Sequence, residues 1–236
     1  MKTNHKNPRR SFLTTLASGA AFIGIGSYLL PKSDKSGNGN GNLLHALNNN
    51  PSDPDEWFNQ IKGKHRMVFD ATRPHELFPF AWPKVFLLTN LKTGTPFDQS
   101  SVVVVLRHDA ICYAFESSLW EKYHFGDVFK AMDPKTKNPS SRNPFWQPAA
   151  DDFKIPGLGA VAIGINNLQA DGVMFCVCEM AINVFTSVVA DRMQMKAEEV
   201  KKDWIAGLLP GIQLVPSGVW AVGRAQEHGC AYCFAG

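Results

Sequence analysis

The side chains best suited to chemistry stand directly after short apolar runs of the sequence. The candidates that follow four such runs are Asp70, Arg73, His75, Arg107, His108, Asp109, Cys178, Ser217 and Gly218. If these runs are neighbouring parallel strands, the residues after them converge on one edge of the sheet, which is where open α/β sheets bind ligands. The spacing therefore predicts a site that combines two histidines with a cysteine.

Cys178 is the strongest candidate nucleophile. It ends the apolar run 173–178 and directly precedes a predicted helix that begins at Glu179. Unpaired backbone N–H groups and the positive end of the helix dipole favour a thiolate at this position. His108, in the loop after a neighbouring run, is expected to add a positive charge or a proton. Cys178 and His108 are accordingly the predicted catalytic residues.

The chain has five cysteines, so at least one is unpaired within a monomer. Cys176 is expected on the same face of its strand as Cys178, about 6.6 Å away. This distance is at the outer limit of disulfide geometry, so we expect Cys176 to be packed inside rather than bonded to Cys178.

The C-terminal pair Cys230 and Cys233 forms a C-x-x-C motif with three open interpretations. It is a redox dithiol, a structural disulfide, or half of a metal site for an ion such as zinc. No histidine follows Cys233, which excludes the usual signal for covalent haem attachment. The last predicted helix runs back toward the amino edge of the sheet, so we expect Cys230 to lie away from Cys178.

A second class of function stays open beside thiol chemistry. The same edge of the sheet would serve a non-catalytic protein that holds a metal or a small anion. Its predicted binding residues are Arg73, His75, Arg107, His108, Asp109 and Ser217. A third class is a protein that keeps the fold and has lost the chemistry. Bound metal would favour the second class, and a sulfur adduct of about 32 Da on Cys178 the first.

Strands and helices alternate along most of the chain. The predicted strands span 66–71, 101–106, 173–178 and 212–216, and the predicted helices span 83–91, 111–122, 157–170, 179–193, 196–204 and 219–228. This alternation predicts an α/β fold, a layered parallel sheet of four to five strands with helices on both faces. Pro83 is expected at a first helical position. Segment 133–152, rich in Pro, Asn and Ser, is expected to be an irregular insertion that is functional or flexible.

The first thirty residues are typical of an export signal. Arg9 and Arg10 precede an uncharged, mildly apolar stretch at 14–30, which is the pattern of a bacterial twin-arginine signal. No clear cleavage site follows, so the protein is expected either free in the periplasm or tethered to the membrane and facing it. Residues 31–55 have the composition of a flexible linker, and 56–236 are expected to form a single domain.

The composition excludes several classes of protein. A content of 44% apolar and 19% charged residues rules out a wholly disordered chain and a multi-span membrane protein. Residues 1–36 hold six Lys or Arg and one Asp, whereas the other 200 residues hold 18 basic and 20 acidic side chains. The folded part therefore has no surplus of positive charge with which to bind nucleic acid.

Four short motifs occur in a consistent order and spacing. They are the turn 106–110, the run 173–178 with the Ala-containing helix after it, the segment 209–219 and the segment 225–229. Together they resemble the DsrE/DsrF-like (YchN-like) sulfur-relay family over residues 64–236. The resemblance implies a layered α/β sheet, assembly as a trimer or hexamer, and a sulfur-carrying cysteine at the position of Cys178.

The same resemblance implies a sulfur donor or a second thiol as the partner of this protein. Two features depart from the family pattern. Family members work in the cytoplasm, whereas this sequence begins like an exported protein, and the pair Cys230 and Cys233 is not part of the pattern. The sequence thus predicts an exported sulfur carrier or thiol-based sulfur-transfer protein that uses Cys178.

Overall fold

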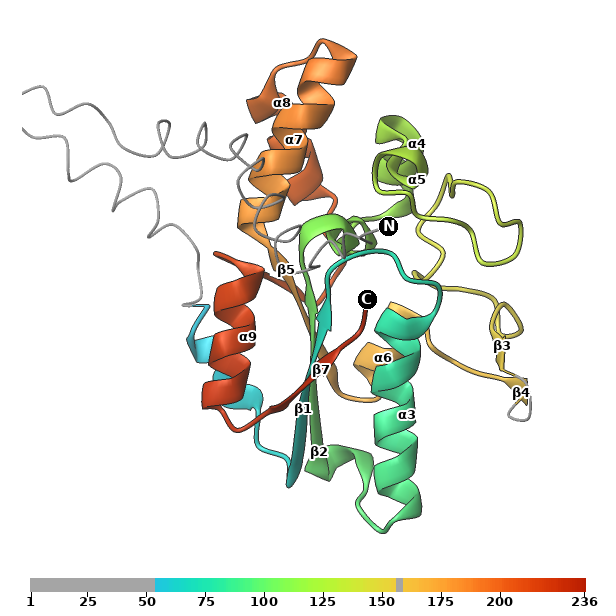
Figure 1. Ribbon diagram of the computed structural model, residues 1–236, viewed down its shortest axis with the longest axis vertical. Coiled ribbons are helices and arrows are strands. Elements are labelled where there is room, and N and C mark those ends of the chain that lie inside the picture. Colours follow the sequence, from blue (N-terminus) through green and yellow to red (C-terminus); the bar gives the residue numbers. More distant parts are fainter. Residues whose placement is uncertain (1–53, 156–158) are drawn as a thin grey trace, which may run out of the picture. The chain divides into compact units, whose positions relative to one another are not determined.

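The computed structural model describes residues 54–155 and 159–236, and these belong to one compact unit (Figure 1). Its centre is a five-stranded parallel sheet in the order β6-β5-β2-β1-β7. The strands are β1 (His65–Ala71), β2 (Ser100–Leu106), β5 (Val173–Cys178), β6 (Ile212–Val215) and β7 (Ala231–Phe234). Two further short strands, β3 (Lys154–Ile155) and β4 (Gly159–Ala160), pair with each other in antiparallel fashion. The predicted α/β class with a layered parallel sheet is confirmed.

The central strand β2 shows why these runs become buried strands. Its four consecutive valines, Val102–Val105, are fully buried. Val102 and Val104 pack into one hydrophobic cluster, and Val103 and Val105 pack into a second cluster on the opposite face. Successive side chains of a strand point to opposite faces, so a continuous β-branched run fits a strand that is covered on both sides.

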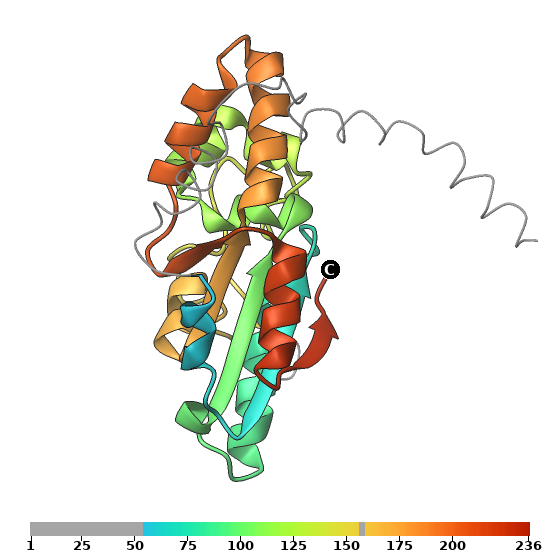
Figure 2. The same cartoon turned by 90° about the vertical axis from the view of Figure 1, so that its left-hand side faces the viewer.

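Helices cover both faces of the sheet. Figures 1 and 2 show α3 (Phe78–Lys92) and α6 (Ile165–Ala170) on one face and α9 (Gly218–Glu227) on the other. The helices α4 (Ser117–Tyr123), α5 (Phe125–Val128), α7 (Glu179–Met193) and α8 (Ala197–Ala206) lie beyond the carboxyl ends of the strands. Among the described residues, no helix has the length and apolar character needed to cross a bilayer.

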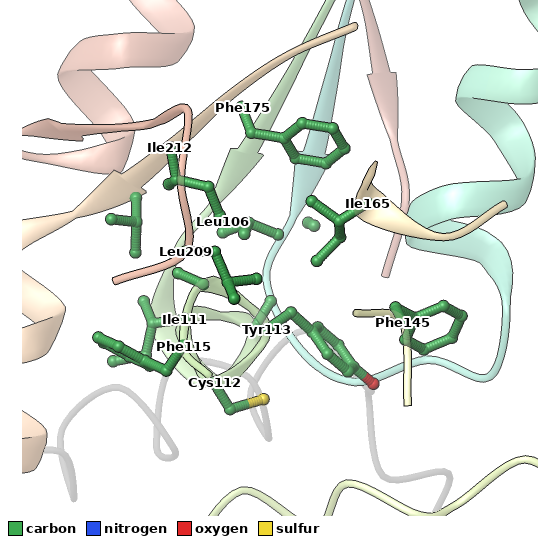
Figure 3. Close-up of a cluster of buried hydrophobic side chains, with 14 of the residues drawn as sticks. Leu106, Ile111, Cys112, Tyr113, Phe115, Phe145, Ile165, Phe175, Leu209 and Ile212 are labelled. Carbon is green, nitrogen blue, oxygen red and sulfur yellow. The ribbon is translucent and has the colours of Figure 1, made fainter. Parts of the chain in front are cut away.

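The larger hydrophobic cluster extends from the α3 face of the sheet into the helices beyond its carboxyl edge (Figure 3). The side chains of Tyr113, Phe115, Phe145 and Phe175 are nearly or wholly buried in it. Phe80 stacks on Phe145 with ring centroids 4.1 Å apart. Large aromatic side chains thus connect the sheet to the segments that cover its carboxyl edge.

Three predicted helices differ from those observed. Helix α3 begins at Phe78, with Pro79 in its first turn, so Pro83 lies inside the helix rather than at its start. A proline at the first turn loses no hydrogen bond, and this earlier start buries Phe80. Instead of one helix over 111–122, a 3₁₀ helix covers His108–Ala114, and α4 follows after an extended Phe115, which forms a bridge with Leu208.

The helix predicted over 157–170 is shorter in the structure, where only Ile165–Ala170 is helical and β4 precedes it. Residues 157 and 158 lie outside the described residues. The strand β7 was not predicted. The helix predicted over 179–193 is confirmed with the same bounds. The export signal and nearly all of the predicted linker also lie outside the described residues.

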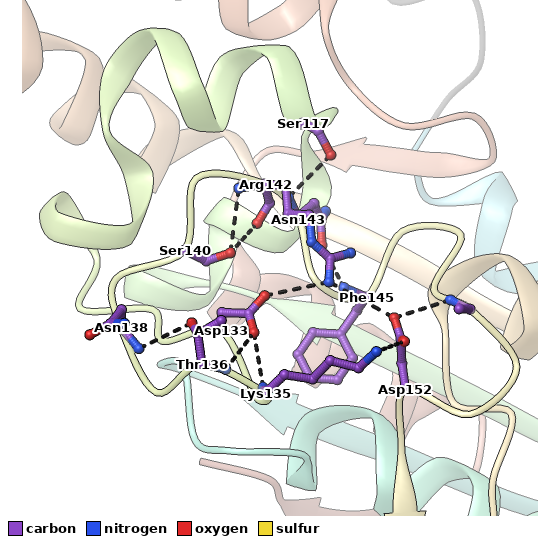
Figure 4. Close-up of polar contacts among 11 residues, drawn as sticks. Ser117, Asp133, Lys135, Thr136, Asn138, Ser140, Arg142, Asn143, Phe145 and Asp152 are labelled. Atoms are coloured by element: carbon purple, nitrogen blue, oxygen red, sulfur yellow. Dashed lines mark hydrogen bonds and ion pairs between the residues drawn. The ribbon is translucent and has the colours of Figure 1, made fainter.

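Segment 133–152 contains no helix or strand and is organised by polar contacts (Figure 4). The amide nitrogen of the fully buried Asn143 donates to the carbonyl oxygens of Tyr113 and Phe115, both at 2.9 Å. Asp133 accepts the backbone N–H groups of Lys135 and Thr136 at 2.9 and 3.0 Å. Buried polar groups with partners are stable in a protein interior, so these contacts fix an otherwise irregular segment against the carboxyl edge of the sheet.

Candidate functional site

Cys178 occupies the junction between a buried strand and a helix. It is the last residue of β5 and the N-cap of α7, and its Sγ accepts the backbone N–H of Ala181 at 3.3 Å. The residue is 7% exposed. A sulfur at this position faces the donors that a helix leaves unpaired in its first turn, and these donors stabilise negative charge. The local structure thus places the Cys178 sulfur at the N-terminus of α7, beside a backbone donor.

Cys176 and Cys178 do not share a face, contrary to the sequence-based expectation. Cys176 is fully buried in the smaller cluster beneath α9, whereas Cys178 belongs to the larger cluster. The chain leaves the strand for α7 at Cys178, which ends the alternation of side chains. The burial of Cys176 agrees with its predicted packing role, and both thiols are free.

Arg107 is a positive group within electrostatic range of Cys178. It follows β2, and its Nε and Nη2 atoms donate to the two carboxylate oxygens of Asp70 at 2.6 and 2.8 Å. The hydrogen bonds to Asp70 raise the pKa of Arg107 above its ordinary value, and the charge of Cys178 contributes in the same direction. A bidentate arginine–carboxylate pair fixes the orientation of the guanidinium group.

Asp70 also joins this site to the last strand. It is 2% exposed, and its Oδ2 atom accepts the hydroxyl of Tyr232 from β7 at 2.9 Å. A buried carboxylate is stable only when its oxygens are hydrogen-bonded, and Arg107 and Tyr232 together satisfy both. Hydrogen bonding and burial raise the pKa of Tyr232, with burial the larger cause.

The N-terminus of α9 completes this edge of the sheet. Ser217 is the N-cap, and its Oγ accepts the backbone N–H of Trp220 at 3.4 Å. The next residue is Gly218, where a Cβ would lie 2.4 Å from the Cβ of Arg107 and force one of the two segments to move. This close approach brings a helix N-terminus against the backbone end of the Arg107 side chain.

The sequence predicts that His108 is the partner of Cys178, but in the structure His108 contacts Asp109 and Phe185. Its backbone is left-handed, with a φ of 50°, and its side chain is 68% exposed. Its Nδ1 atom lies 3.3 Å from Asp109, and its ring faces Phe185 of α7 at 6.1 Å. Among the described residues, no hydrogen bond, ion pair or ring contact joins His108 to Cys178.

Arg73 and His75 lie on the loop after β1, apart from Cys178. Both are exposed, and the ring of His75 lies 4.9 Å from that of Phe78. The backbone N–H of Thr72 donates to Gly236 at 2.8 Å, so the residues after β7 lie against this loop. The predicted edge of the sheet is thus real, but its residues divide into a group around Cys178 and a group after β1.

The pair Cys230 and Cys233 is not a disulfide; both are free thiols. Cys230 is buried in the cluster beneath α9, whereas Cys233 lies within β7 and packs against the opposite cluster. Three residues of extended chain span about 10 Å, beyond the reach of a disulfide. The sequence did not predict β7, and the strand is what separates the two sulfurs.

No metal site is evident in the described part of the chain, where no three His, Cys, Asp or Glu side chains gather as ligands. Tyr232, which donates a hydrogen bond to Asp70, was missing from the predicted site. Asp70 itself was among the predicted residues, because it stands at the end of an apolar run. Tyr232 carried no such signal, because its partner is 162 residues away in the sequence.

No protein-family model and no curated protein matches this sequence. Among solved structures, the chain is similar to a protein of unknown function from Methanobacterium thermoautotrophicum, with 17% identity and a TM-score of 0.37. The match covers 72% of this chain and 99% of the other.

Proposed function

We propose that this protein carries sulfane sulfur as a persulfide on Cys178. The single observation that carries the proposal is the position of the sulfur: it caps α7 and accepts the N–H of Ala181. The resemblance of the sequence to the DsrE/DsrF-like family supports the same role. The guanidinium of Arg107, held in place by Asp70, supports it further, because a positive charge attracts an anionic sulfur donor.

The reaction is an exchange of sulfur between thiols. The Cys178 thiolate attacks the outer sulfur of a donor persulfide, R–S–S–H, and forms a new S–S bond. The donor's own S–S bond breaks, and its inner sulfur leaves as the thiolate R–S⁻. Cys178 then bears the S–S–H group, the proton stays on the outer sulfur, and no external oxidant is needed. Delivery to an acceptor thiolate is the same step in reverse.

Each neighbouring group has a defined role in this proposal. The N–H of Ala181 stabilises negative charge on the sulfur, and Arg107 attracts the anionic donor and its leaving thiolate. Asp70 is a positioning residue, since it holds Arg107 through two hydrogen bonds. His108 is exposed at the rim of this edge, with its Nδ1 atom 3.3 Å from Asp109.

The test uses the full chain, reduced and then incubated with glutathione persulfide. The mass of the intact protein should rise by about 32 Da, and peptide mapping should place the sulfur on Cys178. Cys178→Ser should abolish the adduct, whereas Cys233→Ser, which removes a more exposed thiol, should retain it. An adduct that survives in the Cys178→Ser variant would overturn the proposal.

Binding of a small anion without covalent chemistry is the second candidate function. Arg107 and the N-terminus of α9 favour it, because a guanidinium and a helix N-terminus both attract anions. In this case sulfate or thiosulfate would stabilise the wild type and Cys178→Ser equally against thermal unfolding. Elemental analysis of the purified protein tests whether this edge of the sheet binds a metal ion instead of an anion.

We also propose that the protein is exported through its twin-arginine motif. Replacing Arg9 and Arg10 by Lys keeps the charge but removes the motif. The variant should remain in the cytoplasm, whereas the wild type should reach the periplasm. Equal delivery of both, measured by cell fractionation and immunoblotting, would contradict export by this route.

We further propose a symmetric homo-oligomer, as the family resemblance implies. Apolar side chains exposed on α3 would fit such assembly: Trp82, Val85, Leu88 and Leu91 are each 38–50% exposed. Light scattering of the full chain should give the mass of a trimer or a hexamer. A monomer at micromolar concentration would overturn this proposal.

A further inference from the structure

A cavity of about 480 Å³ lies between the loop after β1 and the irregular insertion. We call it the insertion pocket and define it by His75, Tyr113, Lys130, Lys137 and Phe153 among its lining residues. Its volume is within the usual range for small-molecule sites. It also lies just beyond the carboxyl end of β1, at the edge where open α/β sheets bind ligands.

Tyr113 offers the insertion pocket a fixed donor. The residue is 2% exposed, and its ring packs edge-to-face against the stacked rings of Phe80 and Phe145 at centroid distances of 5.1 and 5.2 Å. Figure 3 shows the ring in the hydrophobic cluster with its hydroxyl at the margin. No described residue forms a hydrogen bond with this hydroxyl, and burial raises the pKa of Tyr113 well above its usual value. The hydroxyl therefore stays protonated at neutral pH and is available to donate to a ligand in the pocket.

The charges around the pocket leave positive groups without partners. The carboxylates of Asp133 and Asp152 already have partners within the insertion (Figure 4). Arg142 lies 3.4 Å from Asp133 and 3.8 Å from Asp152, and Lys135 forms an ion pair with Asp152. Both carboxylates also accept backbone N–H groups. Asp151 lies 4.0 Å from Lys154.

Lys130 and Lys137, by contrast, form no ion pair with any described residue. Glu76 is the one lining carboxylate without such a partner among the described residues. Two free ammonium groups thus face one free carboxylate, which favours an anionic ligand. The walls also include apolar side chains, Leu77, Met132 and Phe153, which suit an apolar body.

We propose that the insertion pocket binds a small organic anion: an apolar or aromatic body with one carboxylate or phosphate group. Lys130 and Lys137 attract the anionic group, the apolar walls hold the body, and the Tyr113 hydroxyl donates to a polar atom of the ligand. This site is separate from Cys178 and does not depend on sulfur chemistry.

The backbone at the two lysines allows a clean test. Lys130 and Lys137 are left-handed, with φ values of 54° and 61°. Asparagine tolerates this conformation better than most residues, so Lys130→Asn/Lys137→Asn removes both charges and keeps the loops. The matched control is Lys62→Asn/Lys64→Asn, which removes two exposed lysines elsewhere on the surface.

Binding to the full chain is measured by ligand-observed NMR with four probes: phenylacetate, phenyl phosphate, benzyl alcohol and inorganic phosphate. We expect phenylacetate or phenyl phosphate to bind at least about tenfold more tightly than benzyl alcohol or inorganic phosphate. Lys130→Asn/Lys137→Asn should weaken the preferred probe about tenfold, Tyr113→Phe should weaken it severalfold, and the control should not change it. The preferred probe then distinguishes a carboxylate from a phosphate ligand.

Three outcomes would overturn the proposal. The first is no binding of either organic anion at concentrations up to about 10 mM. The second is equal binding of benzyl alcohol or inorganic phosphate, which would show no organic-anion site. The third is an equal loss of affinity in the lysine variant and its control, which would show only a general effect of charge.

Discussion

Cys178, the last residue of β5, and Cys233, within β7, lie on parallel strands of one sheet, yet their surroundings differ. Cys178 ends a strand and caps a helix, with Arg107 close by. Cys233 is more exposed, but it lies within β7, in register with Phe69, with no helix N-terminus to stabilise its thiolate. The comparison separates exposure from position: the more exposed thiol lies within a strand, whereas the less exposed one lies at a helix N-terminus.

Asp70 connects the residues after β2 with β7, because it accepts hydrogen bonds from both Arg107 and Tyr232. Replacement of Asp70 should therefore have the largest effect on stability. Asp70→Asn weakens the hydrogen bonds to Arg107 and Tyr232 at a site that is 2% exposed. We expect the free energy of unfolding to fall by about 2–3 kcal/mol, measured by urea denaturation. Tyr232→Phe is the matched control and should cost about 1 kcal/mol, since it removes one hydrogen bond. Equal stability of Asp70→Asn and the wild type would contradict this connection.

The different burial of Cys176 and Cys233 predicts that serine substitutions at the two positions differ in their effect on stability. Cys176→Ser places a hydroxyl in the smaller cluster, where residue 176 is fully buried and the neighbours are apolar. We expect a loss of about 2 kcal/mol in the free energy of unfolding. Cys233→Ser, at a partly exposed position, should change it by less than about 0.5 kcal/mol. Similar losses of unfolding free energy in both variants would contradict the difference in burial between Cys176 and Cys233.

The close contact of α9 with Arg107 gives a third test. Gly218→Ala would put a methyl group 2.4 Å from the Cβ of Arg107, so one of the two must move. We expect a loss of about 1–2 kcal/mol in stability and slower persulfide loading of Cys178. Gly223→Ala is the control, since a Cβ there has no neighbour within 4 Å among the described residues. Unchanged loading in Gly218→Ala would show that the placement of Arg107 does not matter.

The pH dependence of alkylation sharpens the comparison further, with a smaller effect. Burial raises the pKa of Cys230 to about 11 and also raises that of Cys233. A raised pKa means that the thiolate is scarce at pH 8 and increases as the pH approaches 11. Labelling of Cys230 by iodoacetamide should therefore accelerate about tenfold for each unit between pH 8 and pH 10. A rate that is already constant at pH 8 would contradict the raised pKa.

The sequence predicted four of the five main strands because their apolar runs are long enough to show burial on both faces. It could not predict β7, because Ala231–Phe234 is short and partly exposed, and its register comes from pairing with β1. Cys178 was predictable from its place between a strand and a helix. The pairing of Tyr232 with Asp70 was not, since contacts between distant segments depend on the order of the strands.

His108 shows a different limit of the sequence. Its place after β2 was correctly predicted, but its left-handed backbone and exposed side chain were not. Arg107, one residue earlier, points its guanidinium toward Asp70 instead. Which of two adjacent side chains contributes to a site is decided by local backbone angles, and a single sequence leaves these open.

Peptide-mapped alkylation of the folded full chain at pH 8 tests the reactivity of Cys178 most directly. A substoichiometric amount of iodoacetamide is added, and the label on each of the five cysteines is quantified by mass spectrometry. We predict that Cys178, although only 7% exposed, is labelled before the more accessible Cys233, and that Arg107→Gln slows its labelling. If Cys233 is labelled first and Cys178 reacts only when the protein unfolds, Cys178 is a packing residue and not the sulfur carrier.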